Sequence, residues 1–251
     1  MTTVEPPVTA PPAGARPQVT RRSPLRRFFG RPEVGSLIGA VIVIVFFVVM
    51  APTIRHTDSI ATVLYQSATL GIVTVGVALL MIGGEFDLSA GVAVITSALC
   101  ASMVAYQLSM NVWVGVLVAL AVSVGTGFLN GYLMVRTGLP SFLVTLATFL
   151  MLQGINLAVT RLVTGNVATN DISNMAGFGS AKAVFASNIP IFGGSVNITV
   201  FWWLAFVAIA TWILLRTKVG NWIFAVGGRK DSARAVGVPV KATKIGLFMA
   251  V

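Results

Sequence analysis

Residues 112–135 read VWVGVLVALAVSVGTGFLNGYLMV, and this stretch carries no charged side chain. Because an α-helix rises about 1.5 Å per residue, a stretch of this length crosses a hydrocarbon core of about 30 Å. It therefore predicts a transmembrane helix. Apolar stretches of similar length lie on both sides of it and predict further crossings at 35–54, 60–82, 89–108, 139–160 and 198–215.

The composition of the whole chain agrees with this interpretation. Hydrophobic residues make up 56% of the 251 residues and charged residues 10%, whereas soluble domains carry about 25% charged residues. We therefore expect an all-α integral membrane protein, a polytopic helical bundle. Six complete crossings are expected. The apolar run that starts at Ile245 would begin a seventh helix, which the sequence leaves incomplete at Val251.

Several kinds of site are excluded by residue counts and motifs. Cys100 is the only cysteine and His56 the only histidine, which excludes an intramolecular disulfide, a multi-cysteine zinc site and a multi-histidine metal site. No Walker A loop, Rossmann glycine fingerprint or Gly-x-Ser-x-Gly elbow opens a predicted helix. We therefore expect no metal, no cofactor and no catalytic residue in this chain.

The net charge of +10 comes from basic residues that gather in two places. One is the Pro-, Thr- and Ala-rich segment 1–34, which we expect to be a disordered tail, and the other is the loop 216–244. Basic residues beside apolar spans mark the cytoplasmic side. The tail and this loop are therefore expected in the cytoplasm, and the charge requires no nucleic-acid partner. The transmembrane domain 35–251 would also carry an outer loop, 161–197, serving as a docking surface, a lid or a solvated connector.

Two carboxylates, Glu85 and Asp87, lie between two predicted spans with almost no loop around them. Ionisable groups at membrane depth usually face a cavity or a partner, and irregular backbone there is tolerated only inside protein or beside water. The segment is therefore either a re-entrant element of a gate or a tight cytoplasmic turn. In a turn, Asp87 would act as the N-cap of the next helix; Ser89 is also placed to cap it.

Polar side chains form a stripe on the predicted span 139–160. At 100° per residue they fall within an arc of about 140°, and the stripe could line a solute pathway or make hydrogen bonds between helices. Its members are Thr145, Thr148, Gln153, Asn156 and Thr160. The span 60–82 repeats the pattern more weakly around Gln66.

The span 112–135 carries Gly127 and Gly131 at a spacing of four, which favours close packing against another helix. Asn130 beside them is a strong polar group near the cytoplasmic end of this span. In the cytoplasmic loop, Asp231 is expected to cap a short helix at 232–236, with Gly237 as its C-terminal stop. Such a helix suits docking to a soluble partner, although a plain positive-inside connector has the same composition.

Three blocks, in order along the chain, resemble a known family. They are GEFDLSAG at 84–91, NG at 130–131 with PSFLVTL at 140–146, and FAVGG at 224–228 followed by 231–237. The chain resembles permease subunits of the ribose/monosaccharide ABC transporter family, related to branched-chain amino-acid permeases. Glu85 stands where that family usually has a glycine, and Asp231 and Ser232 replace its usual Glu-Ala.

The resemblance implies a multi-pass permease of the plasma membrane that imports a sugar, with ATP hydrolysed on a separate subunit. Its implied partners are an ABC ATPase on the cytoplasmic side, an extracytoplasmic solute-binding protein, a second permease copy or a paralogue, and membrane lipid. The substrate pathway would then include Gln66, Thr145, Thr148, Gln153 and Asn156. Gly84, Glu85, Asp87, Ser89 and Asn130 would organise the gate. Asp231, Ala233, Arg234 and Gly237 would couple the permease to the ATPase.

Three other functions are weighed against this one. A permease for branched-chain amino acids or nucleosides would share the architecture. A proton-coupled secondary transporter would use Glu85 or Asp87 as a proton relay. An intramembrane enzyme is disfavoured, because no nucleophile–base pair is visible in the sequence.

Overall fold

The computed structural model describes residues 32–191 and 194–251. The chain divides into two compact units, which meet in sequence between Arg55 and His56. In the first unit, α2 (Pro32–Met50) is followed by the short 3₁₀ helix η1 (Pro52–Arg55). α2 ends before Pro52 because a proline disfavours helical backbone at the residue that precedes it. Most of the tail predicted at 1–34 lies outside the described residues.

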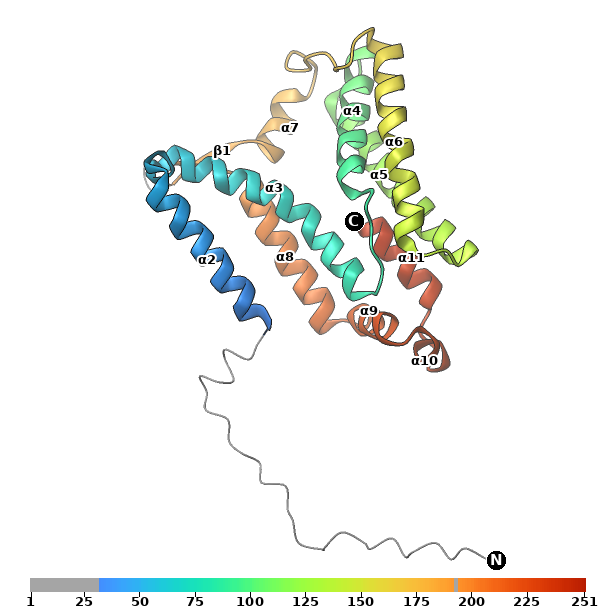
Figure 1. The fold of residues 1–251 in the computed structure, drawn as a ribbon. Coiled ribbons are helices and arrows are strands. Elements are labelled where there is room, and N and C mark those ends of the chain that lie inside the picture. Colours follow the sequence, from blue (N-terminus) through green and yellow to red (C-terminus); the bar gives the residue numbers. More distant parts are fainter. Residues whose placement is uncertain (1–31, 192–193) are drawn as a thin grey trace, which may run out of the picture. The chain divides into compact units, whose positions relative to one another are not determined.

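The second unit is almost entirely helical (Figure 1), which confirms the all-α class. Its long helices are α3 (Thr57–Ile82), α4 (Ala90–Gln107), α5 (Val112–Thr137), α6 (Ser141–Thr164) and α8 (Thr199–Arg216). Within the described residues, these five are long and apolar enough to cross a membrane. Each coincides with a predicted span. The crossing predicted at 35–54 corresponds to α2, and the total of six crossings remains a prediction.

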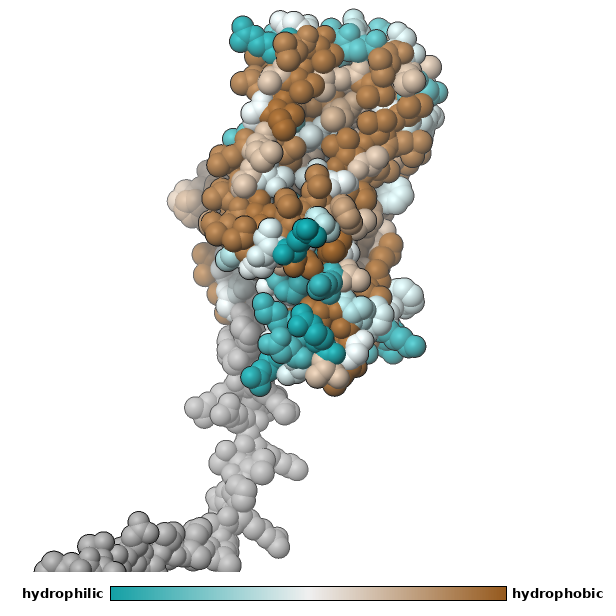
Figure 2. All heavy atoms as spheres, turned by 90° about the vertical axis from the view of Figure 1, so that its right-hand side faces the viewer, coloured by the Kyte–Doolittle hydropathy of each residue, from teal (hydrophilic) through white to brown (hydrophobic). Residues whose placement is uncertain are grey.

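The long helices leave their apolar side chains exposed. In Figure 2, apolar residues cover much of the face on which α5 and α6 lie, with hydrophilic residues toward its two ends. Phe142, Leu150 and Leu157 of α6 are about half exposed, and α8 has no buried residue. Such faces are expected where lipid replaces water as the surrounding medium.

Two groups of helices make up the second unit. α4, α5 and α6 pack together, and α3 packs against α8 (Figure 1). At one end, α9 (Lys218–Gly228) contacts α3 and α8, and α11 (Val240–Ala250) contacts α3, α5 and α9. The core lies where these elements meet and includes Leu80, Ile223 and Phe248. The segment between α3 and α4 runs past this core.

The close packing predicted for the glycine pair of α5 is confirmed. A side chain at Gly127 would overlap the carbonyl oxygen of Phe248, and a Cβ at Gly131 would lie 2.8 Å from the Ile245 Cα. α11 therefore approaches α5 backbone to backbone, as the small-residue spacing predicts.

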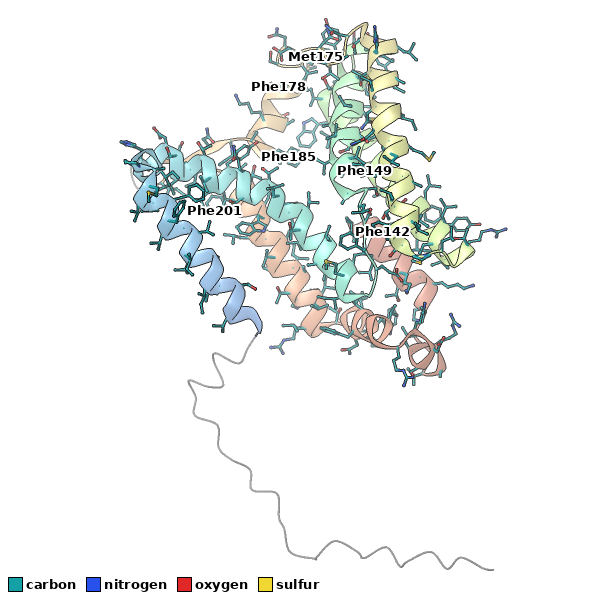
Figure 3. All side chains as sticks on the ribbon, in the orientation of Figure 1. Phe142, Phe149, Met175, Phe178, Phe185 and Phe201 are labelled. Carbon is teal, nitrogen blue, oxygen red and sulfur yellow. The ribbon has the colours of Figure 1, made fainter. Side chains whose placement is uncertain are left out.

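The segment expected as an outer loop, 161–197, contains regular secondary structure. It contains α7 (Phe178–Phe185) and a hairpin of β1 (Asn188–Ile191) and β2 (Gly194–Asn197). Ala181 packs with Ala105 and Val112, and Met175 and Phe178 lie against them (Figure 3). The small apolar cluster that orders this segment is made with α4 and α5, so it could not be read from the segment alone.

The loop 216–244 likewise contains three helices, α9, α10 (Lys230–Ala235) and the start of α11. The predicted cap is wrong: Arg229 is the N-cap of α10, and Asp231 lies in its first turn, where a carboxylate still suits the helix dipole. The stop at Gly237 is confirmed, with φ +82°. α11 begins at Val240 rather than at Ile245, because its first turns carry polar residues that apolar-run counting misses.

Candidate functional site

The segment between α3 and α4 begins with a tight reversal of the backbone. Gly84 has φ +79°, a conformation that glycine adopts without steric cost. The Gly84 N–H donates to Met81 O at 3.0 Å and the Glu85 N–H to Leu80 O at 3.2 Å. These two bonds satisfy carbonyls at the end of α3, as in a Schellman motif. The chain leaves α3 in a defined direction, and Glu85–Ser89 turn back toward α6.

Asp87 does not cap α4 as a plain N-cap would. The residue is 8% exposed, and its Oδ1 accepts bonds from the Ser89 N–H at 2.7 Å and the Ser89 hydroxyl at 2.6 Å. Ser89 occupies the N-cap position but makes no side-chain capping bond. Asp87 thus closes a turn within its own segment. The prediction that Asp87 is the N-cap of α4 is therefore wrong, and the role of the segment in a gate stays a prediction.

The Ser89 hydroxyl continues into a chain of hydrogen bonds between helices. Asn130 of α5 is fully buried, and its Nδ2 donates to Ser89 Oγ at 2.8 Å. Thr148 Oγ1 of α6 donates to Asn130 Oδ1 at 2.6 Å. Asp87, Ser89, Asn130 and Thr148 therefore link three elements, and we call these four residues the buried polar chain.

The backbone of the same segment is held by α6. The Phe86 N–H donates to Ser141 Oγ and the Leu88 N–H to Thr145 Oγ1, each at 3.1 Å. Thr145 is fully buried, so its hydroxyl holds this segment and faces no open space. Sequence analysis missed Ser141. The only signal for it was its position directly after Pro140, at the start of a helix.

Glu85 makes an ion pair with Lys244 of α11. Their side chains are 11% and 8% exposed, respectively, and this is the one salt bridge found among the side chains that the structure describes. Sequence analysis placed Lys244 in the cytoplasmic cluster of basic residues without assigning it a partner. A buried carboxylate and ammonium satisfy each other, which explains how both charges are accommodated inside the protein.

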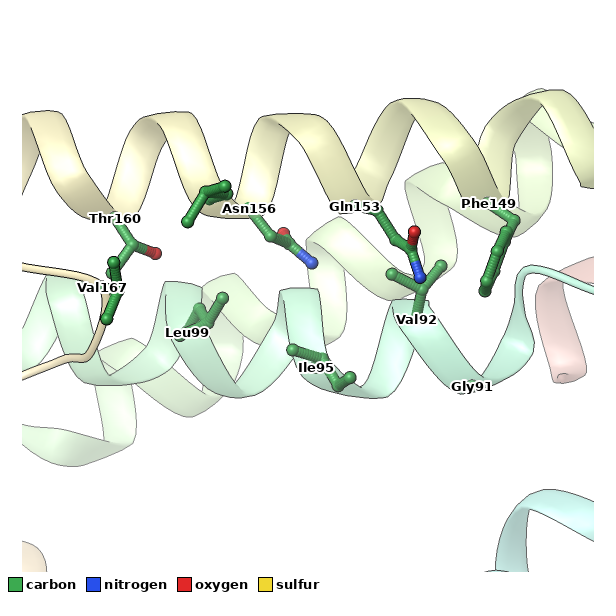
Figure 4. Close-up of a pocket in the computed structure, with 10 residues that line it drawn as sticks. Gly91, Val92, Ile95, Leu99, Phe149, Gln153, Asn156, Thr160 and Val167 are labelled. Carbon is green, nitrogen blue, oxygen red and sulfur yellow. The ribbon is translucent and has the colours of Figure 1, made fainter.

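The remaining residues of the predicted pathway lie in two different places. Gln153 and Asn156 line a pocket of about 720 Å³ between α4 and α6, with their amides directed toward α4 (Figure 4). Asn156 Nδ2 donates to Thr96 Oγ1 at 3.0 Å, and the buried hydroxyl of Thr160 at the same pocket has no hydrogen-bond partner among the described residues. Gln66 is exposed on α3 and does not line this pocket.

The residues predicted to couple to an ATPase lie on or directly after α10. Asp231 and Arg234 are exposed, whereas Ala233 is 3% exposed and packs against Val226 and Val240. The Gly237 N–H donates to Arg234 O at 3.1 Å and the Val238 N–H to Ala233 O at 3.0 Å. The end of α10 is thus closed by the same motif as the end of α3, and its exposed side is held in a defined orientation.

With this geometry in place, comparison with known proteins identifies the family. Residues 59–251 match the family described as the permease component of the branched-chain amino acid transport system. The chain belongs to this family. Its members are transport permeases rather than enzymes, and with its apolar helices the chain is a multi-pass protein of the plasma membrane.

Curated relatives resemble the chain over most of its length. The ribose import permease protein RbsC of Escherichia coli K12 is 27% identical over 229 residues, which cover 89% of this chain and 67% of the relative. The RbsC protein of Haemophilus influenzae is 27% identical over a stretch that covers 86% of this chain and 64% of that relative. The galactose/methyl galactoside import permease protein MglC of Escherichia coli K12 is 27% identical over a stretch that covers 83% of this chain and 63% of that relative. The chain spans about two thirds of the length of these relatives. No solved structure matches it.

Proposed function

We propose that the chain is the membrane-spanning permease subunit of an ATP-driven importer and that its substrate is a monosaccharide. The observation that carries this proposal is the buried polar chain, which links the segment 84–91 to α5 and α6. α11 packs against α5 and also contacts α10, the helix on which an ATPase would dock. The similarity to ribose and galactose import permeases supports a sugar as the substrate.

The transporter would contain further subunits. A separate ABC ATPase would dock on α10, where Asp231 and Arg234 are exposed and Ala233 is buried. A solute-binding protein would deliver the sugar from outside, and a second permease copy or a paralogue would complete the pathway. Movement of α10 would then bias the membrane helices between two states.

A neutral hydroxylated solute fits the polar groups that are available. The pocket between α4 and α6 has amides and a hydroxyl in its lining and no charged side chain, whereas an amino acid would bring two charges that require partners. The two carboxylates that a proton relay would use are already engaged, Glu85 by Lys244 and Asp87 by Ser89. These contacts favour a sugar importer over an amino-acid importer and over a proton-coupled transporter.

The test is solute uptake into vesicles that contain the full-length protein with its ATPase and binding protein, measured with and without ATP. The wild type is expected to take up a pentose or hexose only with ATP. Gly237→Val should abolish this uptake, because valine resists the left-handed conformation that closes α10. Gly237→Asn is the matched control, since asparagine tolerates that conformation. Uptake that follows a proton gradient and ignores ATP would contradict the proposal.

A further inference from the structure

The salt bridge between Glu85 and Lys244 joins two parts of the second unit that are far apart in sequence. Glu85 belongs to the segment after α3 and Lys244 to α11; the Lys244 side chain is buried and that of Glu85 is largely buried. A lone charge in either position would be strongly destabilising. Replacing both charges by apolar groups is often neutral for stability, so stability alone does not require an ion pair at this point.

Lys244 is mechanically connected to α10. Val240, in the first turn of α11, packs with Ala233 of α10 and Val226 of α9 in one buried cluster. Lys244 lies one helical turn after Val240, on the same face of α11. Because a helix moves as a rigid element, a displacement of α10 that carries Val240 along also displaces the Lys244 ammonium group.

Glu85 is connected in turn to the buried polar chain. The next backbone N–H, that of Phe86, is held by Ser141. Two residues after Glu85, the Asp87 carboxylate begins the hydrogen bonds that lead through Ser89 to Asn130. A displacement of the Glu85 carboxylate therefore acts on a short segment that is fixed at both ends to α5 and α6.

We propose that Lys244 is a positioning residue of the importer, acting through Glu85. The ion pair transmits movement of α10 to the segment 84–91. It also transmits movement of that segment back to α10, because the attraction between the two charges acts equally on both groups. Packing contacts between Leu247 and Gly83 and between Gly227 and Gly84 lie beside it. These are van der Waals contacts between uncharged groups, whereas the ion pair is an attraction between two specific charged groups. This inference rests on the proposed function.

The experiment compares the full-length protein and its ATPase in vesicles, with uptake, ATP hydrolysis and the midpoint of thermal unfolding measured for each variant. Glu85→Gln and Lys244→Met should each lower the uptake per ATP hydrolysed by about tenfold. The charge swap, Glu85→Lys with Lys244→Glu, should restore most of it, as should Lys244→Arg alone. The apolar pair, Glu85→Leu with Lys244→Met, should unfold near the wild-type temperature yet remain uncoupled.

Lys241→Met is the matched control. Lys241 is an exposed lysine on the same helix, outside any salt bridge between described residues, and its replacement should leave the uptake per ATP unchanged. The inference is overturned if the apolar pair couples as well as the wild type, because the charges would then serve folding alone. It is also overturned if neither the swap nor Lys244→Arg restores coupling. A wild type without ATP-dependent uptake would instead overturn the proposed function, and the inference with it.

Discussion

Asn130 is the residue on which the contacts of the 84–91 segment converge. Its amide donates to Ser89 and accepts from Thr148 while the side chain is fully buried. Among side chains of this size, only an amide offers a donor and an acceptor at opposite sides of one planar group. An aspartate has the same shape but only acceptors. The identity of this residue is therefore set by hydrogen bonding rather than by volume.

Replacing Asn130 by aspartate should destabilise the protein by about 1–3 kcal/mol. The change removes the donor to Ser89, whose own hydrogen already goes to Asp87, and places a second carboxylate beside that hydroxyl. Thr148→Val removes the hydroxyl that donates to Asn130 Oδ1 and lies 3.1 Å from Val144 O, and it should cost about 1 kcal/mol. Denaturant titration in detergent measures both values, and an Asn130→Asp variant as stable as Thr148→Val would contradict this account.

At the scale of elements, the contact between α5 and α11 decides how closely α11 packs against the long apolar helices. Gly127 and Gly131 allow the two backbones to meet, and Phe248 packs in one buried cluster with Leu80 and Met134. Within the described part of the chain, three threonines of α3 make no hydrogen bond to another helix through their hydroxyls. Thr62, Thr69 and Thr74 instead donate to carbonyls four residues earlier in α3 itself. A polar stripe on one helix therefore does not by itself mark a pathway.

Gly127→Ala should lower the free energy of unfolding by about 1–3 kcal/mol, because the added methyl group would overlap the carbonyl of Phe248. Gly125→Ala is the matched control on the same helix. A Cβ at Gly125 meets no atom within 4 Å, and alanine is the better helix former by about 1 kcal/mol. Thermal unfolding of the two variants in detergent should separate them; equal midpoints would refute the close packing.

At the scale of the whole molecule, the orientation in the membrane follows from the basic residues. The loop 216–244 is rich in lysine and arginine, and the segment 161–197 is not. Positive charge stays on the cytoplasmic side. The two segments are separated by α8, so they are expected on opposite sides of the membrane.

A labelling experiment in intact cells checks this orientation. Asn174→Cys and Ser232→Cys, each in a Cys100→Ala background, place single thiols at exposed positions of the two segments. A membrane-impermeant maleimide should label the cysteine at 174 in intact cells and the cysteine at 232 only after permeabilisation. The reverse pattern would require the opposite orientation, and α10 would then be inaccessible to a cytoplasmic ATPase.

The sequence by itself determined the membrane class and the position of each long helix of the second unit. Both depend on local properties, the length of an apolar run and the thickness of the hydrocarbon core. It also determined the end of α10 at Gly237, because the left-handed conformation there is a property of one residue. The packing face of α5 could also be predicted from the sequence, because the spacing of Gly127 and Gly131 is a local pattern that does not depend on which helix packs there.

Only the tertiary structure decided which polar groups meet. Lys244 and Ser141 contact the 84–91 segment from other helices, and no local pattern links positions so far apart. The tertiary structure also showed that the polar stripe of α6 has two roles. Thr145 and Thr148 bond to the Leu88 N–H and the Asn130 amide, whereas Gln153 and Asn156 line a pocket. A buried polar group must find a partner, but which partner it finds depends on how the helices pack, and that is set by the whole chain at once.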